Sequence, residues 1–391
     1  MTDQPPSTPP SARPERTSPT LWTAFLGVAL VGLVALPKRR GGSLPAASSR
    51  PAKEDRKLGT EDAPASHEGA AAERLAEAEP ERGRKADTPS EIPAKGWKDI
   101  ALRLYQEFSN DRILLVAAGV TFYAILALFP AIAALVSIYG AVADPSTINH
   151  HLNDLRGILP DGAIDIVGGQ VKRLVDKGDK ALGLTAVISI LISLWSANGG
   201  MKAVFDALNI AYEEKEKRSF VMLNLQSLAF TVGALLFVVL ALTGIVVVPA
   251  ALQVLGLDQK AWYIALLRFP ALLVLVVASL AVLYRFGPSR RKPRWRWVTW
   301  GSAVAGTLWL VASGLFSWYV ANFGSYNETY GSLGAAIGFM TWIWLSTTVV
   351  LLGAELNAEM EHQTARDTTV GGDKPLGARQ ARMADTVAVS N

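Results

Sequence analysis

The chain has 391 residues, of which 50% are apolar, and its formal net charge is +4. It contains no cysteine, which excludes disulfides, thiolate nucleophiles and metal clusters held by cysteine. The segments 1–19, 37–95 and 363–391 are rich in Pro, Ala, Ser and charged residues, with few large apolar side chains. Such segments bury too little surface to offset chain entropy, so we predict that all three are disordered.

The first apolar run, residues 20–36, has two interpretations. Arg13 and Arg16 precede it, as basic residues do in a secretory signal peptide, but no small-x-small cleavage site follows it directly. The basic cluster at 38–40 favours a retained transmembrane anchor whose start lies outside the cytoplasm.

Residues 96–362 contain six further apolar stretches, and a helix needs about 20 such residues to cross a bilayer. The stretches are Ile113–Val142, Leu182–Ala197, Phe220–Val248, Trp262–Leu283, Val298–Phe323 and Leu333–Ala354. The predicted fold is all-α, a polytopic membrane protein with a six-helix transmembrane bundle. Pro130 predicts a kink or tilt in the first span, and Gly96–Arg112 has the pattern of an interfacial helix.

The short loops orient this block. Ala207–Ser219 and Arg285–Trp297 together contain nine Lys and Arg residues, whereas Ala250–Ala261 and Gly324–Ser332 contain one. By the positive-inside bias, both ends of the six-helix block are cytoplasmic, and so are the disordered linker before it and the disordered tail after it.

Three groups of residues, in the right order, resemble the YihY/BrkB family of inner-membrane proteins, formerly labelled ribonuclease BN. They are Val116–Tyr123 with Leu128-Phe129-Pro130, Leu194–Gly200 with Ala207-Leu208-Asn209 and Tyr212, and Asn322–Gly334 with Leu352–Glu359. The resemblance covers about 96–362. It implies a multi-pass protein of the bacterial inner (plasma) membrane whose activity is unsettled. Some members are linked to the cell envelope and discussed as transporters, and the nuclease label is widely regarded as a misassignment.

A polar stripe marks the second span and its continuation. Its residues recur at helical spacing and share one face, and Lys202 and Asp206 are placed to pair; the stripe consists of Asn198, Lys202, Asp206, Asn209 and Glu213. This stripe is either the wet side of a helix leaving the membrane or the lining of a substrate path. The glycines that follow Asn198 favour an interrupted span, as in many transporters.

Glu355 follows the last apolar run, at the predicted cytoplasmic mouth of the sixth span. It is predicted either to pair with Lys202 or the basic loop, or to act in gating or proton coupling. Glu359 and His362 have the spacing of a di-metal motif, but the block contains no second Glu-x-x-His at comparable depth, so no metal site is predicted.

Other candidates are surface contacts. Tyr123, Tyr326, Asn327 and Tyr330 are candidate substrate contacts that equally suit packing. Basic side chains in the second inner loop are predicted to meet membrane lipids with anionic headgroups rather than nucleic acid; they are Arg290, Arg291, Arg294 and Arg296. The small-residue pairs Gly334-x-x-x-Gly338 and Gly301-x-x-x-Ala305 suit close helix packing within one chain or in a homo-oligomer.

Three functions remain open from the sequence. The favoured one is a transporter or flippase-like protein for an envelope lipid or an amphipathic anion, and the alternative is a non-transporting membrane scaffold for envelope assembly. A tRNA-processing ribonuclease is disfavoured because the four histidines cannot converge. No catalytic residue and no cofactor is predicted.

Overall fold

The computed structural model describes residues 74, 76–140, 184–242, 261–323 and 332–388. All of them belong to Glu61–Asn391, one of two compact units of the chain, and the other unit, Met1–Thr60, contains no described residue. The anchor predicted at 20–36 therefore lies outside the described residues.

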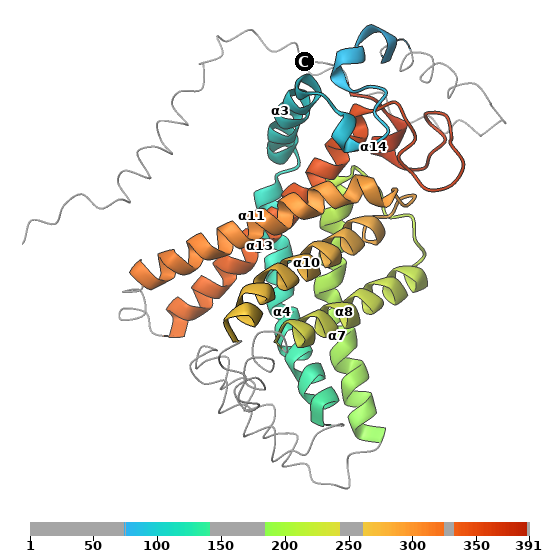
Figure 1. Cartoon of the computed structure of the whole chain (residues 1–391). Coiled ribbons are helices and arrows are strands. Elements are labelled where there is room, and N and C mark those ends of the chain that lie inside the picture. The colour runs from blue at the N-terminus through green and yellow to red at the C-terminus, as the bar shows by residue number, and fades with distance from the viewer. Residues whose placement is uncertain (1–73, 75, 141–183, 243–260, 324–331, 389–391) are drawn as a thin grey trace, which may run out of the picture. The chain divides into compact units, whose positions relative to one another are not determined.

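Six long helices occupy the six predicted spans (Figure 1). They are α4 (Ile113–Gly140), α7 (Leu184–Ala211), α8 (Phe220–Leu242), α10 (Ala261–Phe286), α11 (Trp295–Phe323) and α13 (Ser332–Gln363). The predicted interfacial helix is α3 (Ala94–Asn110). Among the described residues there is no named strand, only one isolated bridge between Pro293 and Thr369.

The helices suit a membrane by length and composition. Among the described residues, four segments are long and apolar enough to cross a bilayer, and α10 contributes a shorter apolar helix, Pro270–Phe286. The four are Ile113–Ile132, Phe220–Ala241, Trp295–Val320 and Ala336–Gln363. Large apolar side chains on these helices are exposed, among them Leu115, Phe122, Leu225 and Leu315. Such surfaces suit hydrocarbon rather than water, and the fold is that of an all-α polytopic membrane protein.

Helices α4 and α7 run side by side (Figure 1), and a glycine allows their approach. A Cβ on Gly200 would lie 3.0 Å from the Cβ of Ala127 on α4, closer than nearly all real contacts. The interrupted second span that we predicted is wrong, because α7 is one continuous helix through Gly199 and Gly200. Here glycine serves close packing rather than a break. Helix α4 likewise continues through Pro130.

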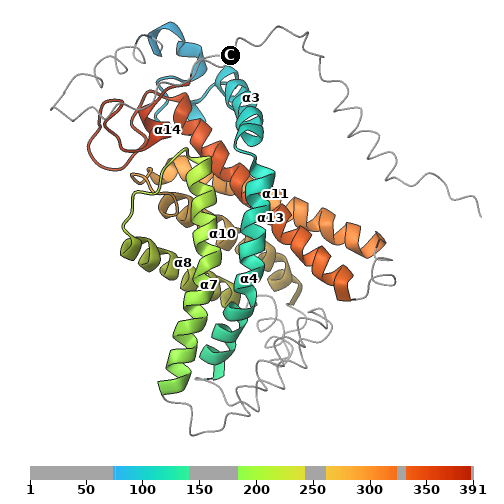
Figure 2. The same cartoon turned by 180° about the vertical axis from the view of Figure 1, so that it is seen from behind.

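Helices α11 and α13 also pack closely, and both views show them side by side (Figures 1 and 2). A Cβ on Gly353 would lie 2.6 Å from the Cβ of Ala305 and 2.9 Å from the carbonyl oxygen of Gly301. Asn357 reinforces this crossing, because its Oδ1 accepts a hydrogen bond from the amide of Gly301 at 3.0 Å. The predicted role of Gly301 and Ala305 in helix packing is confirmed within the chain.

The predicted disorder of 363–391 and of the end of 37–95 does not hold for the described residues. Residues 364–388 fold back beside the 3-10 turns η1 (Pro80–Arg82) and η2 (Pro89–Glu91) and include α14 (Arg382–Asp385) (Figure 1). The carbonyl oxygen of Arg84 accepts hydrogen bonds from the amide of Ala365 at 2.8 Å and from the Thr364 hydroxyl at 3.3 Å. We call residues 79–110, 287–294 and 363–388 together the polar cap.

Buried arginines explain why the polar cap folds despite its polar composition. Arg379 is 4% exposed and donates hydrogen bonds to the carbonyl oxygens of Ala365, Arg366, Lys374 and Ala384. Hydrogen bonds to charged groups stabilise a structure by about 1.5–3 kcal/mol each. They substitute here for the apolar burial that the composition lacks.

Candidate functional site

A partly open apolar cavity of about 470 Å³ lies between α8 and α10, and α7, α11 and α13 each add one residue to its lining. Helix α8 lines it with Phe230, Gly233, Ala234 and Phe237. From α10 come Val276, Ala278, Ser279, Leu280, Val282 and Leu283, and the other helices add Met201, Trp309 and Val350. A Cβ on Gly233 would meet nothing within 4 Å, so the cavity has open space at this residue.

The lining of this cavity comes from the most apolar parts of the helices. Among the described residues that line it, Ser279 and the indole of Trp309 are the only polar side chains. Ligand pockets generally have volumes of roughly 300–1,000 Å³ and mostly apolar walls with a few polar groups. The cavity therefore suits the apolar part of a ligand, such as an acyl chain.

Asn198 is not a lining residue of the cavity but lies close in sequence to Met201, which is. On α7 it is one turn before Met201, and its Oδ1 faces the hydroxyl of Thr231 at 3.4 Å, next to Phe230 on α8. Its side chain is fully buried, and its Nδ2 has no hydrogen-bond partner among the described residues. A buried amide without an acceptor is costly and leaves a donor free for a ligand.

The rest of the polar stripe does not converge on one site. Lys202 lies over the ring of Trp195, 5.3 Å from its centre, and Asp206 is exposed. The predicted Lys202–Asp206 pair is absent from the ion pairs of the described residues. The stripe thus divides into a buried end at Asn198 and an exposed end at Asp206.

Asn209 ties loops together. Its Oδ1 accepts a hydrogen bond from the amide of Ser289 at 2.7 Å, and its Nδ2 donates to Glu216 at 3.1 Å. A hydrogen bond from Arg218 is the main reason that the pKa of Glu216 falls to about 2. Asn209 therefore joins the end of α7 to both basic loops, a structural role.

Glu355 is buried among other carboxyl groups rather than among cations. It is 1% exposed, and neither of its carboxyl oxygens accepts a hydrogen bond from an N–H or hydroxyl donor among the described residues. The charged groups that act on it are those of Asp111, Glu359 and Glu107. The predicted pairing with Lys202 or the basic loop is not formed.

The basic loop is mostly engaged within the polar cap. Arg290 has a side chain only 1% exposed, lies 2.6 Å from Glu361 and stacks over the ring of Tyr212 at 4.2 Å. Its predicted contact with headgroups is wrong for this reason. Arg294 binds Asp373 at 2.6 Å, Arg291 is partly buried and Arg296 is exposed, so lipid binding by Arg296 stays a prediction.

The candidate substrate contacts are only partly described. Tyr123 on α4 is 50% exposed, and its ring meets that of Phe122 edge-on at 5.5 Å between centres. Tyr326, Asn327 and Tyr330 lie outside the described residues.

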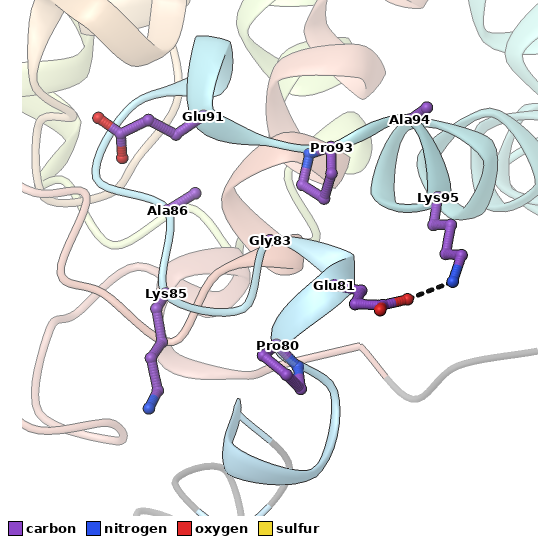
Figure 3. Close-up of a pocket in the computed structure, with 9 residues that line it drawn as sticks. All are labelled: Pro80, Glu81, Gly83, Lys85, Ala86, Glu91, Pro93, Ala94 and Lys95. Carbon is purple, nitrogen blue, oxygen red and sulfur yellow. Dashed lines mark hydrogen bonds and ion pairs between the residues drawn. The ribbon is translucent and has the colours of Figure 1, made fainter.

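A second, open pocket of about 620 Å³ lies on the polar cap (Figure 3). Its lining includes Glu81 and Lys95, which form an ion pair, and the backbone around Gly83 and Pro93. Both charged side chains are mostly exposed, at 72% and 70%, so this is a shallow hollow between folded turns.

Comparison with known proteins identifies the family. The family model of virulence factor BrkB matches residues 104–376, about 70% of the chain. The chain belongs to the BrkB family. The match runs from α3 past the end of α13, so it includes part of the polar cap as well as all six long helices.

The chain is also similar to individual proteins. The chain is 29% identical over 249 residues to the ribonuclease-like protein YfkH of Bacillus subtilis, covering 62% of this chain and 88% of that protein. It is 29% identical to a UPF0761 membrane protein of Alkalilimnicola ehrlichii, covering 70% of this chain and 61% of the relative. For the UPF0761 membrane protein NMB0524 of Neisseria meningitidis serogroup B the identity is 28%, with coverages of 66% and 62%.

The chain thus spans about three fifths of the length of these two UPF0761 relatives. No solved structure matches.

Two features of the site escaped sequence reasoning. Asp111 sits between two helical patterns and looks like an ordinary junction residue. Its contact with Glu355 joins residues that are far apart in sequence, and neither hydropathy nor spacing reports such contacts. The α8–α10 cavity was not predicted, because the helices that line it have the composition of ordinary apolar spans. Only Gly233, a residue without a side chain within such a span, could have indicated open space.

Proposed function

We propose that this chain is an inner-membrane transporter or flippase-like protein that moves an amphipathic molecule, an envelope lipid or an amphipathic anion. The α8–α10 cavity holds the apolar part of this molecule. Asn198 offers its free amide to a polar part. The activity is movement across or within the membrane, without bond cleavage.

The cavity is the observation that carries this function. It lies between helices whose outer surfaces are apolar, so an acyl chain exchanges one hydrocarbon environment for another. A polar headgroup in the same place requires hydrogen-bonding partners, because an unpaired polar group in hydrocarbon costs several kcal/mol. Asn198 supports this role because it has an unused donor in a buried position one helical turn before Met201, which lines the cavity.

The proposed topology has six membrane crossings, with both ends of the block cytoplasmic. Helices α7 and α10 join the four longest apolar segments as the remaining crossings. The basic loops support this orientation through the positive-inside bias. The polar cap is then on the cytoplasmic side.

Filling the cavity tests the function. In vesicles that contain only this protein, we expect Gly233→Phe to slow the movement of a fluorescent phospholipid analogue about tenfold or more. A ring at residue 233 occupies the open space beside α10, and a loss of about 1.4 kcal/mol in transition-state stabilisation is tenfold in rate. The rate is measured by quenching of the outer-leaflet fluorophore.

Gly314→Phe is the matched control, because Gly314 on α11 is also an exposed helical glycine with open space around it. We expect it to keep the wild-type rate. Equal rates for Gly233→Phe and wild type would refute the role of the cavity. A non-transporting scaffold would give no lipid movement above protein-free vesicles in any variant.

A further inference from the structure

Glu355 on α13 is a buried carboxyl group without a cationic partner among the described residues. It is 1% exposed, and both of its carboxyl oxygens lack a hydrogen-bond donor among the described residues. A buried ionised carboxylate is strongly disfavoured unless a cation or several donors satisfy it. The neutral, protonated form avoids this penalty.

The groups around Glu355 do not supply a free cation. Those that face it or its neighbour Asp111 come from α3, the α3–α4 junction, the end of α7 and α13 itself. They are Glu107, Asp111, Tyr212, Glu213 and Glu359. The nearby Arg103 pairs with Glu359, to which it donates at 2.5 Å, and donates to Gln363 at 2.7 Å; its Nη1 has no partner among the described residues.

Asp111 is held against Glu355 by a tight turn. Its amide donates to the carbonyl oxygen of Glu107 at 2.8 Å, and the next residue, Arg112, has a φ of 52°. Residues other than glycine rarely adopt this left-handed conformation. The turn sets the angle between α3 and α4 and keeps the Asp111 carboxyl in place.

Two carboxyl groups in contact hydrogen bond only when one of them carries a proton. Burial raises the pKa of Asp111, and its hydrogen bond with Glu355 opposes this rise. Paired carboxyl groups that share a proton recur in enzymes and proton pumps.

We infer that Asp111 and Glu355 form a proton-binding site, in which one proton is shared between the two carboxyl groups at neutral pH. Release of this proton to water leaves two adjacent carboxylates. Their repulsion loosens the contact of α13 with the α3–α4 junction. The site requires no lipid, so it stands or falls independently of the proposed transport.

Infrared spectroscopy of the full chain in lipid nanodiscs tests this inference directly. We expect the carbonyl stretch of a protonated carboxyl group at neutral pH, its loss as the pH is raised, and its absence in Glu355→Gln. Gln has the shape of protonated Glu, so this variant preserves the packing. Glu81→Gln is the control, because Glu81 is 72% exposed and ionised, and it should leave the band unchanged.

Hydrogen exchange provides a second readout that does not depend on band assignment. In the wild type, exchange of the amides of residues 107–116 should increase above the intrinsic rate change as the pH is raised. In Glu355→Gln this additional increase should disappear. Absence of the band from wild type at neutral pH, or its persistence in Glu355→Gln, would overturn the shared proton. If Glu355→Gln does not fold, the pH titration of the wild-type band alone decides.

Discussion

The role of Arg290 shows what residue-level patterns reveal and what they miss. The sequence places it in a cationic loop, and its charge there is a sound topological signal. Its side chain nevertheless turns inward to Glu361, which also accepts a hydrogen bond from Thr368 at 2.8 Å. Partners far along the chain decide whether a surface-like arginine is available for ligands.

The buried Arg290–Glu361 pair yields a prediction about stability. We expect Arg290→Met to lower the free energy of unfolding by about 3–5 kcal/mol, because Glu361 then stays buried without its cation. The double variant Arg290→Met/Glu361→Met should lose less than the sum of the two single variants. Denaturant unfolding in detergent micelles measures both.

Arg296→Met is the control for this pair and should change little, since Arg296 is exposed. Additive losses in the double variant would show that the two side chains do not stabilise each other.

Elements were easier to predict than contacts. Long apolar runs identified all six long helices because the hydrocarbon requirement is local and one-dimensional. The apolar stretch of the second span ends at Ala197, but α7 continues to Ala211, as the helical spacing of the polar stripe indicates; Phe205 and Leu208 pack into the core while Asp206 stays exposed. Hydropathy detects only the apolar part of a helix that lies in the membrane. The helix itself can continue beyond that part where its side chains still pack against the rest of the protein.

The folded structure of residues 364–388, after α13, was not predicted for a different reason. Its folded form depends on hydrogen bonds and ion pairs rather than on apolar burial, and composition alone reads such a segment as disordered. Asp367 is one example: it accepts hydrogen bonds from the amide and hydroxyl of Thr369 and from the amide of Lys374.

This segment should detach in acid. Burial alone would raise the pKa of Asp367, but its hydrogen bonds and Arg379 outweigh burial and lower the pKa. A depressed folded-state pKa means that the stability is present above the unfolded value, about 3.9, and is lost as the pH falls through the folded value. Hydrogen exchange of residues 364–388 should therefore increase in acid before that of α11.

Asp367→Asn should already loosen these residues at neutral pH. Equal protection of the variant and the wild type at both pH values would contradict this role of Asp367.

At the scale of the whole molecule, the orientation of the helices in the membrane can be tested by thiol labelling without background from native cysteines. The chain has no cysteine, so a single introduced thiol is the only site for a maleimide. With intact cells and a membrane-impermeant reagent, we expect Asn327→Cys to be labelled and Arg296→Cys to be protected until the membrane is opened. The reverse pattern would invert the proposed topology.

The polar cap joins the two ends of the described chain. Gln363 donates to the carbonyl oxygen of Arg82 at 2.8 Å across 281 positions of sequence. During synthesis, the early segment must therefore wait until almost the entire polypeptide has left the ribosome before it finds its place. A polypeptide truncated after α13 would insert its helices normally. Its early segment would lack the contacts with residues 364–388 and would be exposed to quality-control proteases.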